Sequence, residues 1–176
     1  MIKFKRILFP TDFSPAAVHA LDYAIALALQ HDATLVLTHV IEDIGFSSPF
    51  GLSSFPITLE YQHGFEEGAK AHLHKAVSAQ VRRQLEVREC LPQGKPFVEI
   101  IRIAKQEQVD LIVIPTRSKP DPKQVHLGST AEHVVRLAPC PVLVVRHPDE
   151  QVAGHHSSAE KDYVSAGRSQ TKRPDV

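Results

Sequence analysis

The sequence predicts an α/β fold, an open sheet of five parallel strands with helices on both faces. Short apolar runs alternate strictly with segments of helical periodicity between residues 1 and 146. Most connections between them are short, and several strands are continuous apolar runs, as is usual for buried parallel strands. Crossovers of this kind are right-handed, which places helices on both faces of a single sheet.

The first strand–helix–strand unit occupies the N-terminal part of the chain. Residues 7–10 form an apolar run that predicts a buried strand. Ser14 is a good N-cap for the helix that follows, and Pro15 suits the first helical position. Apolar residues recur at helical spacing from Ala17 to Leu29, and the β-branched run 34–40 predicts the second strand. Short connections make the two strands parallel.

The middle of the chain contains the longest connection. Residues 42–58 are rich in Gly, Ser, Pro and Phe and show no period, which predicts a long, flexible surface loop. A helical pattern runs from about Leu59 to Gln84, and the alternating residues 85–91 predict the third strand. Pro96 begins another helix, which continues to about Ala104.

The last strand–helix–strand unit completes the sheet. Residues 109–114 are the most apolar strand, and a proline-containing loop over 115–127 follows it. A short helix is expected from about Thr130 to Ala138, and residues 129–132 have the spacing of a capping box. The apolar residues 142–145 predict the last strand.

The domain is expected to span residues 1–146 and to be followed by a disordered tail. Residues 147–176 contain almost no bulky apolar side chains and no period. The whole chain has 20 Lys and Arg and 20 Asp and Glu, so its net charge is zero. This balance argues against binding nucleic acid or an anionic membrane by bulk charge.

The same composition favours a cytoplasmic protein. No apolar run approaches the roughly 18 residues of a membrane span. The apolar run that follows Arg6 is too short for a signal peptide. The two cysteines, Cys90 and Cys140, cannot form a disulfide framework.

The candidate functional residues follow the strands. In open parallel sheets, ligands bind at the carboxyl ends of the strands, where the strand order reverses. The segments to examine are therefore residues 10–14, 40–43, 91–95 and 115–128, and those that follow Arg146.

From Lys5 to Arg146 the chain resembles the universal stress protein family, of the UspA type. The resemblance rests on RILFPTDFS at 6–14, THV at 38–40, VDLIVI at 109–114, LGSTAEHVVR at 127–136 and APCPVLVV at 138–145. It implies a Rossmann-like sheet of the adenine nucleotide alpha hydrolase type, with strand order 3-2-1-4-5. The crevice then falls between the first and fourth strands.

Many members of this family bind ATP in that crevice through the signature G-x2-G-x9-G-[ST]. This chain keeps only its last part, Gly128-Ser129, and has Pro115 and Ser118 in place of the other two glycines. Pro115 has no N–H to donate, which weakens the phosphate site. The cations of the intervening loop, Arg117, Lys119 and Lys123, could offset this loss by binding phosphate. The alternative is a solvated basic loop.

The resemblance assigns the adenosine end of the site to the first two strands. It places Asp12 near the ribose and the backbone of Val40 at the adenine. For Asp12 the alternative is that it only organises the turn before Ser14. ATP or AMP is the expected ligand, with Mg²⁺ only alongside ATP. The complete expected site is Pro10, Thr11, Asp12, Val40, Pro115, Thr116, Arg117, Gly128, Ser129 and Thr130.

The histidines give little support for a metal site. His72 and His74 are two residues apart in a helix, so they face different sides and cannot share a metal ion. His39 is expected to be a structural histidine near the crevice, and it could contact a ligand. His126 and His133 flank the Gly128-Ser129 turn and could approach a phosphate, or His133 could simply be exposed. No triplet of histidines in the sequence has the spacing of metal ligands.

The cysteines and the remaining motifs do not indicate a dedicated enzyme. Cys140 is expected to be a buried small side chain, and Cys90 to be partly accessible on the more polar face of its strand. Neither has a nucleophile's partner, and the chain contains neither a GxSxG elbow nor a Walker loop. The resemblance leaves slow ATP hydrolysis open, because slow ATP turnover is possible in this family.

The function expected is that of a stress-response protein whose nucleotide occupancy is read by an unknown protein partner. The alternative is an interaction module that has lost nucleotide binding. The last strand is an apolar sheet edge, which would aggregate unless it is covered. In the family this strand commonly pairs across a two-fold axis. A homodimer is therefore expected through Val142, Leu143, Val144 and Val145.

Overall fold

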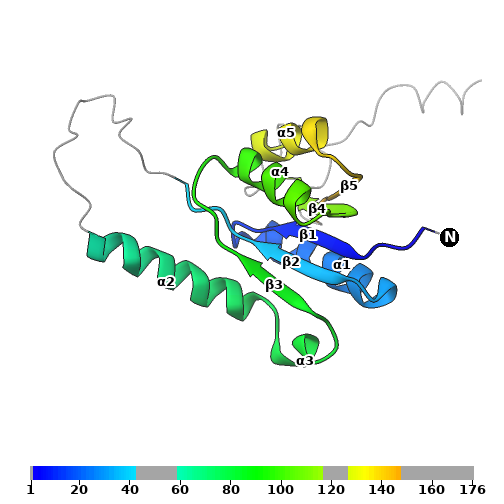
Figure 1. Ribbon diagram of the computed structural model, residues 1–176, viewed down its shortest axis with the longest axis horizontal. Coiled ribbons are helices and arrows are strands. Elements are labelled where there is room, and N and C mark those ends of the chain that lie inside the picture. Colours follow the sequence, from blue (N-terminus) through cyan, green and yellow to red (C-terminus); the bar gives the residue numbers. More distant parts are fainter. Residues whose placement is uncertain (1, 43–58, 117–126, 148–176) are drawn as a thin grey trace, which may run out of the picture.

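The computed structural model describes residues 2–42, 59–116 and 127–147. It confirms a five-stranded sheet of order β3-β2-β1-β4-β5, in which every pair of neighbours is parallel (Figure 1). The strands are β1 (Arg6–Pro10), β2 (Thr34–Thr38), β3 (Val87–Cys90), β4 (Leu111–Pro115) and β5 (Val142–Val145).

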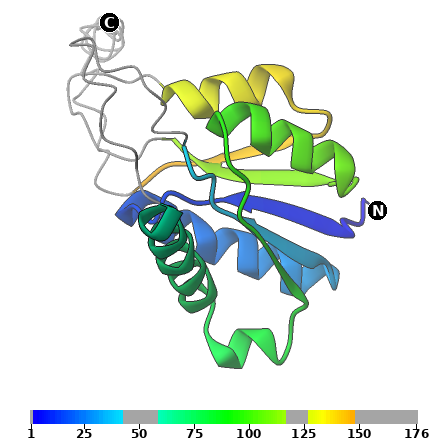
Figure 2. The ribbon, with the colours of Figure 1, turned by 60° about the vertical axis from the view of Figure 1, so that its left-hand side comes forward.

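The helices cover both faces of this sheet, as predicted. Figure 2 shows α1 and α2 on one side of the sheet and α4 and α5 on the other. The helices are α1 (Pro15–His31), α2 (Leu59–Ala76), α3 (Ala79–Arg82), α4 (Pro96–Gln106) and α5 (Ser129–Leu137). No helix in the described residues is long and apolar enough to cross a membrane.

The apolar runs of the sequence arise because the central strands are buried on both faces. Ile7 and Phe9 of β1 pack in the core that contains α1 and the end of α2, while Leu8 packs in the core that contains α4 and α5. All three side chains are fully buried. Successive side chains of a strand point to opposite faces, so a strand buried on both must be apolar at every position.

Some element boundaries differ from those predicted. The helix expected over residues 59–84 is divided into α2 and α3, because Ser78 takes an extended conformation and caps α3 by accepting from the Val81 N–H. The capping box expected at residues 129–132 is wrong. Gly128 is the N-cap of α5, no side chain caps this helix, and Ser129 is already its first residue.

The first helix begins as the sequence indicates. Ser14 Oγ accepts a hydrogen bond from the Ala17 N–H at 3.2 Å, and Pro15 is the first helical residue. Except for Glu42 and His147, the predicted loop over residues 42–58 and the predicted tail over 147–176 lie outside the described residues.

Candidate functional site

A cavity of about 250 Å³ lies at the carboxyl ends of β1, β2 and β4, where the strand order reverses. This is the place where open parallel sheets bind ligands. The first turns of α4 and α5 close its other side. Its lining residues are Pro10, Thr11, Asp12, His39, Val40, Glu42, Pro96, Ile100, Ile114, Pro115, Thr116, Gly128, Ser129, Thr130 and Ala131.

The structure brings the predicted site residues together. Arg117 lies outside the described residues, and every other residue of the expected site lines the cavity. His39, expected near the crevice, also lines it. That these residues contact a ligand stays a prediction.

The sequence missed the apolar wall that the helices contribute. Pro96 and Ile100 of α4 and Ala131 of α5 line the cavity. Ile100 and Ala131 are nearly fully buried in the core shared by α4 and α5. Their helical spacing identified a buried face. One sequence signal could have identified them as cavity residues. They lie in or next to the first turn of a helix that follows a strand.

Hydrogen bonds fix the turn from β1 into α1. The Thr11 N–H donates to Thr38 O at 2.8 Å, and Thr11 Oγ1 accepts from the Phe13 N–H at 3.0 Å. His39 Nδ1 lies 2.8 Å from Thr11 O. Because a carbonyl oxygen can only accept, Nδ1 carries the proton of this bond. The cavity wall at Thr11 is therefore held by both β2 and the residue that follows it.

Asp12 takes part in organising the same turn. Its Oδ1 accepts a hydrogen bond from the Ser14 N–H at 3.0 Å. The structural role expected for this carboxylate is thus present. A carboxylate has about four acceptor positions. The bond to Ser14 is therefore compatible with the second expected role, accepting hydrogen bonds from ribose hydroxyls.

The N-terminus of α5 presents backbone N–H groups at the cavity. The Gly128 N–H donates to Thr116 O at 2.8 Å, which closes the base of the preceding loop. The Glu132 N–H donates to Gly128 O and makes the first bond of the helix. The N–H groups of Ser129, Thr130 and Ala131 therefore have no acceptor within the helix. Such groups and the helix dipole attract anions.

The end of β4 offers much less to an anion. Pro115 has no N–H, and the Thr116 N–H donates to Val145 O at 3.0 Å. The described part of the cavity wall carries two carboxylates, Asp12 and Glu42, and no Lys or Arg. Within this part, α5 is the main source of positive potential for a phosphate.

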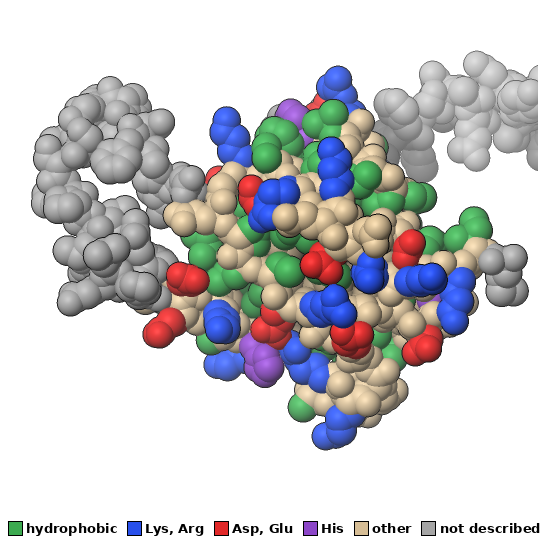
Figure 3. Space-filling model, in the orientation of Figure 1, with side chains coloured by type: hydrophobic (Ala, Val, Ile, Leu, Met, Phe, Trp, Pro, Cys, Tyr) green, Lys and Arg blue, Asp and Glu red, His purple; other side chains and the backbone are tan. Residues whose placement is uncertain are grey.

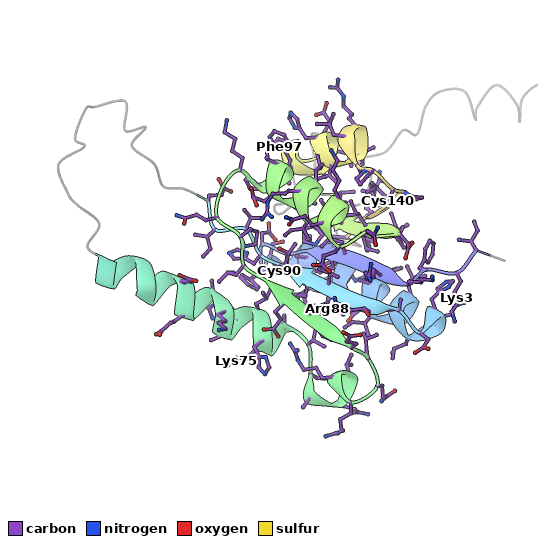
Figure 4. The ribbon with its side chains drawn as sticks, in the orientation of Figure 1. Lys3, Lys75, Arg88, Cys90, Phe97 and Cys140 are labelled. Carbon is purple, nitrogen blue, oxygen red and sulfur yellow. The ribbon has the colours of Figure 1, made fainter. Side chains whose placement is uncertain are left out.

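The remaining reactive side chains lie outside the cavity lining. Cys90, on β3, and Cys140, just before β5, are both half-buried and come from separate elements (Figure 4). Partial accessibility was correctly expected for Cys90, whereas Cys140 is more exposed than predicted. Burial raises the pKa of both thiols, with Glu107 adding to the shift at Cys90 and Asp110 at Cys140.

The histidines outside the cavity have structural contacts. His133 is exposed, stacks on Phe97 at 4.5 Å between ring centroids, and has Nδ1 2.7 Å from Ser129 O. His74 Nδ1 lies 3.0 Å from Glu89 Oε1. Across the described ranges, no three His, Cys, Asp or Glu side chains are placed to hold a metal ion.

The fold and the cavity define an open, parallel α/β protein with a crevice at its topological switch point. The family model described as "Universal stress protein family" matches residues 3–146. The chain therefore belongs to the universal stress protein family, whose members act in the response to stress.

Curated relatives and solved structures agree with this assignment. The universal stress protein MJ0531 of Methanocaldococcus jannaschii is 32% identical over 148 residues, which cover 84% of this chain and 85% of that protein. The solved structure of the universal stress protein UspA from Lactobacillus plantarum has a TM-score of 0.69 and a sequence identity of 27% to this chain. The match covers 83% of this chain and 100% of that one. A second solved structure, that of the protein MJ0577, has a TM-score of 0.68 and a sequence identity of 30% to this chain. The match covers 83% of this chain and 98% of that one.

Proposed function

We propose that the cavity binds an adenine nucleotide, AMP or ATP, and that the chain is a nucleotide-responsive regulatory protein of the stress response. The observation that supports this most is the convergence of three elements on one cavity. Asp12 supplies acceptors after β1, Val40 supplies an apolar wall after β2, and α5 supplies N–H groups that have no acceptor within the helix. These groups follow the order of the parts of a nucleotide, with the base and the sugar at one end and the phosphate at the other.

Each part of the nucleotide finds a matching group in this arrangement. The ribose hydroxyls donate to the Asp12 carboxylate. The base lies against Val40 and the apolar side chains of α4, and a phosphate accepts from the first N–H groups of α5. Mg²⁺ would accompany ATP only and would be bound mainly through its phosphates.

Calorimetric titration with ATP, ADP and AMP tests this function. A Gly128→Val variant should lose binding, because a branched side chain would occupy the helix N-terminus. Its fold should survive, since φ of −62° at Gly128 suits any residue. Gly64→Val is the matched control, because no described atom lies within 4 Å of its added Cβ. Equal binding by the wild type and Gly128→Val would place the site elsewhere.

A second candidate is an interaction module without a nucleotide. It is favoured by the poor donor supply at the end of β4, where Pro115 has no N–H and that of Thr116 is bonded to Val145. No heat from the wild type at millimolar nucleotide would favour this candidate. Equal affinities for ATP and AMP would instead show that the basic loop at residues 117–123 does not hold the outer phosphates.

We further propose a homodimer through β5. The two sheet edges differ in chemistry: β3 carries the charged Arg88 and Glu89, whereas β5 is VLVV, with 37% of Leu143 exposed. Charged side chains protect an edge from pairing, and apolar ones do not. Leu143→Lys should shift the mass measured by light scattering from dimer to monomer. Val18→Lys, at an exposed site on α1, is the control and should leave the dimer intact.

A further inference from the structure

Phe13 has an unusual backbone for a bulky residue. It lies between Asp12, which lines the cavity, and Ser14, which caps α1. Its φ is +60°, in the left-handed region. Glycine takes this conformation without steric cost, whereas a bulky side chain there is a genuine outlier. Such outliers persist where surrounding contacts hold them, often beside functional sites.

The contacts that hold Phe13 are aromatic. Its ring centroid lies 4.5 Å from that of His39 and 5.7 Å from that of His72, the latter in an edge-on arrangement. These separations are typical of favourable ring pairs. His39 lines the cavity and is bonded to the Thr11 carbonyl, while His72 belongs to α2. The Phe13 ring therefore bridges the cavity wall and α2.

The docking of α2 depends on its C-terminal half. Leu73, and Val77 just after the end of the helix, are almost fully buried in the core that Phe13 also packs against. Towards the N-terminus of α2, Gly64 and Gly68 have no described atom within 4 Å of the position of an added Cβ. Figure 1 shows this end of α2 extending beyond the sheet. The contact with Phe13 thus lies where the docked half of the helix begins.

We infer that Phe13 is a positioning residue that couples ligand binding in the cavity to the docking of α2. The inference rests on the nucleotide binding proposed above. A ligand held by Thr11 and Asp12 restrains the turn, the turn restrains the ring of Phe13, and the ring supports His72. Coupling between two sites is reciprocal, so docked α2 also strengthens ligand binding.

Four variants separate the ring from the backbone. Phe13→Gly removes the ring and suits φ of +60°, while Phe13→Tyr keeps an aromatic ring. His72→Ala removes the contact on α2, outside the cavity lining. Lys70→Ala changes an exposed residue of the same helix and is the control. Circular dichroism and thermal melting confirm that each variant is folded.

The readouts are AMP affinity by calorimetry and hydrogen exchange of residues 69–77 with and without AMP. In the wild type, AMP should slow exchange in this segment. Phe13→Gly and His72→Ala should each weaken AMP binding by about fivefold or more and remove that protection. Phe13→Tyr and Lys70→Ala should behave as the wild type.

The two proposals fail in different ways. Wild-type protein that binds AMP, with unchanged affinity in Phe13→Gly and His72→Ala, would overturn the coupling alone. Unchanged exchange of residues 69–77 on AMP binding would do the same. If the wild type bound no AMP, both the proposed function and the coupling would be wrong.

Discussion

At the residue scale, Asp12 has one observed role and one proposed role, which a pair of substitutions can separate. One role is visible, since Oδ1 accepts from the Ser14 N–H. The other, accepting from ribose, is proposed. The side chain of Asn retains an acceptor oxygen for the Ser14 N–H but loses the negative charge and half of the acceptors.

Asp12→Asn should therefore leave the melting temperature nearly unchanged and weaken AMP binding about tenfold, the equivalent of one hydrogen bond to a charged group. Asp12→Ala should weaken binding as much and should also lower stability by about 1 kcal/mol, because the turn loses its acceptor. Calorimetry and thermal melting measure the two effects. Full affinity in Asp12→Asn would assign the carboxylate to the turn alone.

The thiols provide a prediction that does not depend on a ligand. Burial raises the pKa of Cys90 and of Cys140, so a smaller fraction of each is thiolate at neutral pH than in a free cysteine. Alkylation by iodoacetamide should reach its half-maximal rate at a pH above about 8.5, the value of an unperturbed thiol. The Cys140→Ser and Cys90→Ser variants report the two sites separately. A midpoint below that of glutathione would contradict the burial seen here.

At the element scale, a single carboxylate joins the starts of the central strands β1 and β4. Asp110 Oδ2 accepts from the backbone N–H groups of Lys5 and Arg6 at 2.6 and 2.9 Å, and the Asp110 N–H donates to Arg6 O. Arg6 also donates through Nη1 to Glu107 O at 2.8 Å. These bonds fix the register of the two strands whose carboxyl ends form the crevice.

Asp110→Ala should lower the free energy of unfolding by about 1–3 kcal/mol, because two backbone donors lose a charged acceptor. Asp110→Asn retains an acceptor oxygen and should cost less. Urea unfolding monitored by circular dichroism measures both variants. Equal stability of the wild type and Asp110→Ala would show that this carboxylate does not hold the register.

The edge strand β3 is organised by charge. Arg88 donates to Glu86 at 2.9 Å and to Glu107 at 3.5 Å, and both signs are interspersed on this face (Figure 3). The hydrogen bond from Arg88 is the main cause of the lowered pKa of Glu86. A lowered pKa in the folded state means that this pair supports folding above the unfolded pKa and loses that effect as the pH falls through the folded pKa. Because Glu86 is exposed, the effect is small.

The periodicity of the sequence was sufficient to predict the strands and most of the helices. It failed to predict helix boundaries that depend on the conformation of a single residue. The central strands were identifiable because burial on both faces requires continuous apolar runs. The break between α2 and α3 could not be identified from the sequence, because Ser78 fits a helical pattern as well as it fits an N-cap. The start of α5 was placed one residue too late, since Gly128 forms the cap through its backbone and its bond to Thr116.

At the scale of the whole molecule, the position of the cavity was predictable, because a parallel sheet of the strand order implied by the family resemblance brings the carboxyl ends of its central strands together. Asp12, Val40 and Gly128 are far apart in sequence, and the strand order makes them neighbours in the cavity wall. The role proposed for Phe13 was not predictable. It depends on a positive φ and on rings contributed by residues 39 and 72, which no local pattern reports.

The zero net charge of the chain is compatible with binding one small anion. Its 20 basic and 20 acidic residues balance over the whole sequence. The described cavity wall carries two carboxylates and no Lys or Arg, so attraction for a phosphate there would come mainly from the N-terminus of α5. Specific binding would thus depend on the local geometry of α5, and total charge has little influence on it.

An NMR titration with AMP tests the central claim most directly, because it reports where on the molecule the ligand binds. Amide shifts should concentrate in residues 11–14, 39–42 and 128–131, which lie in the described cavity wall or next to it in the sequence. Gly128→Val should abolish them. Shifts confined to another surface, or none at millimolar AMP, would contradict the account.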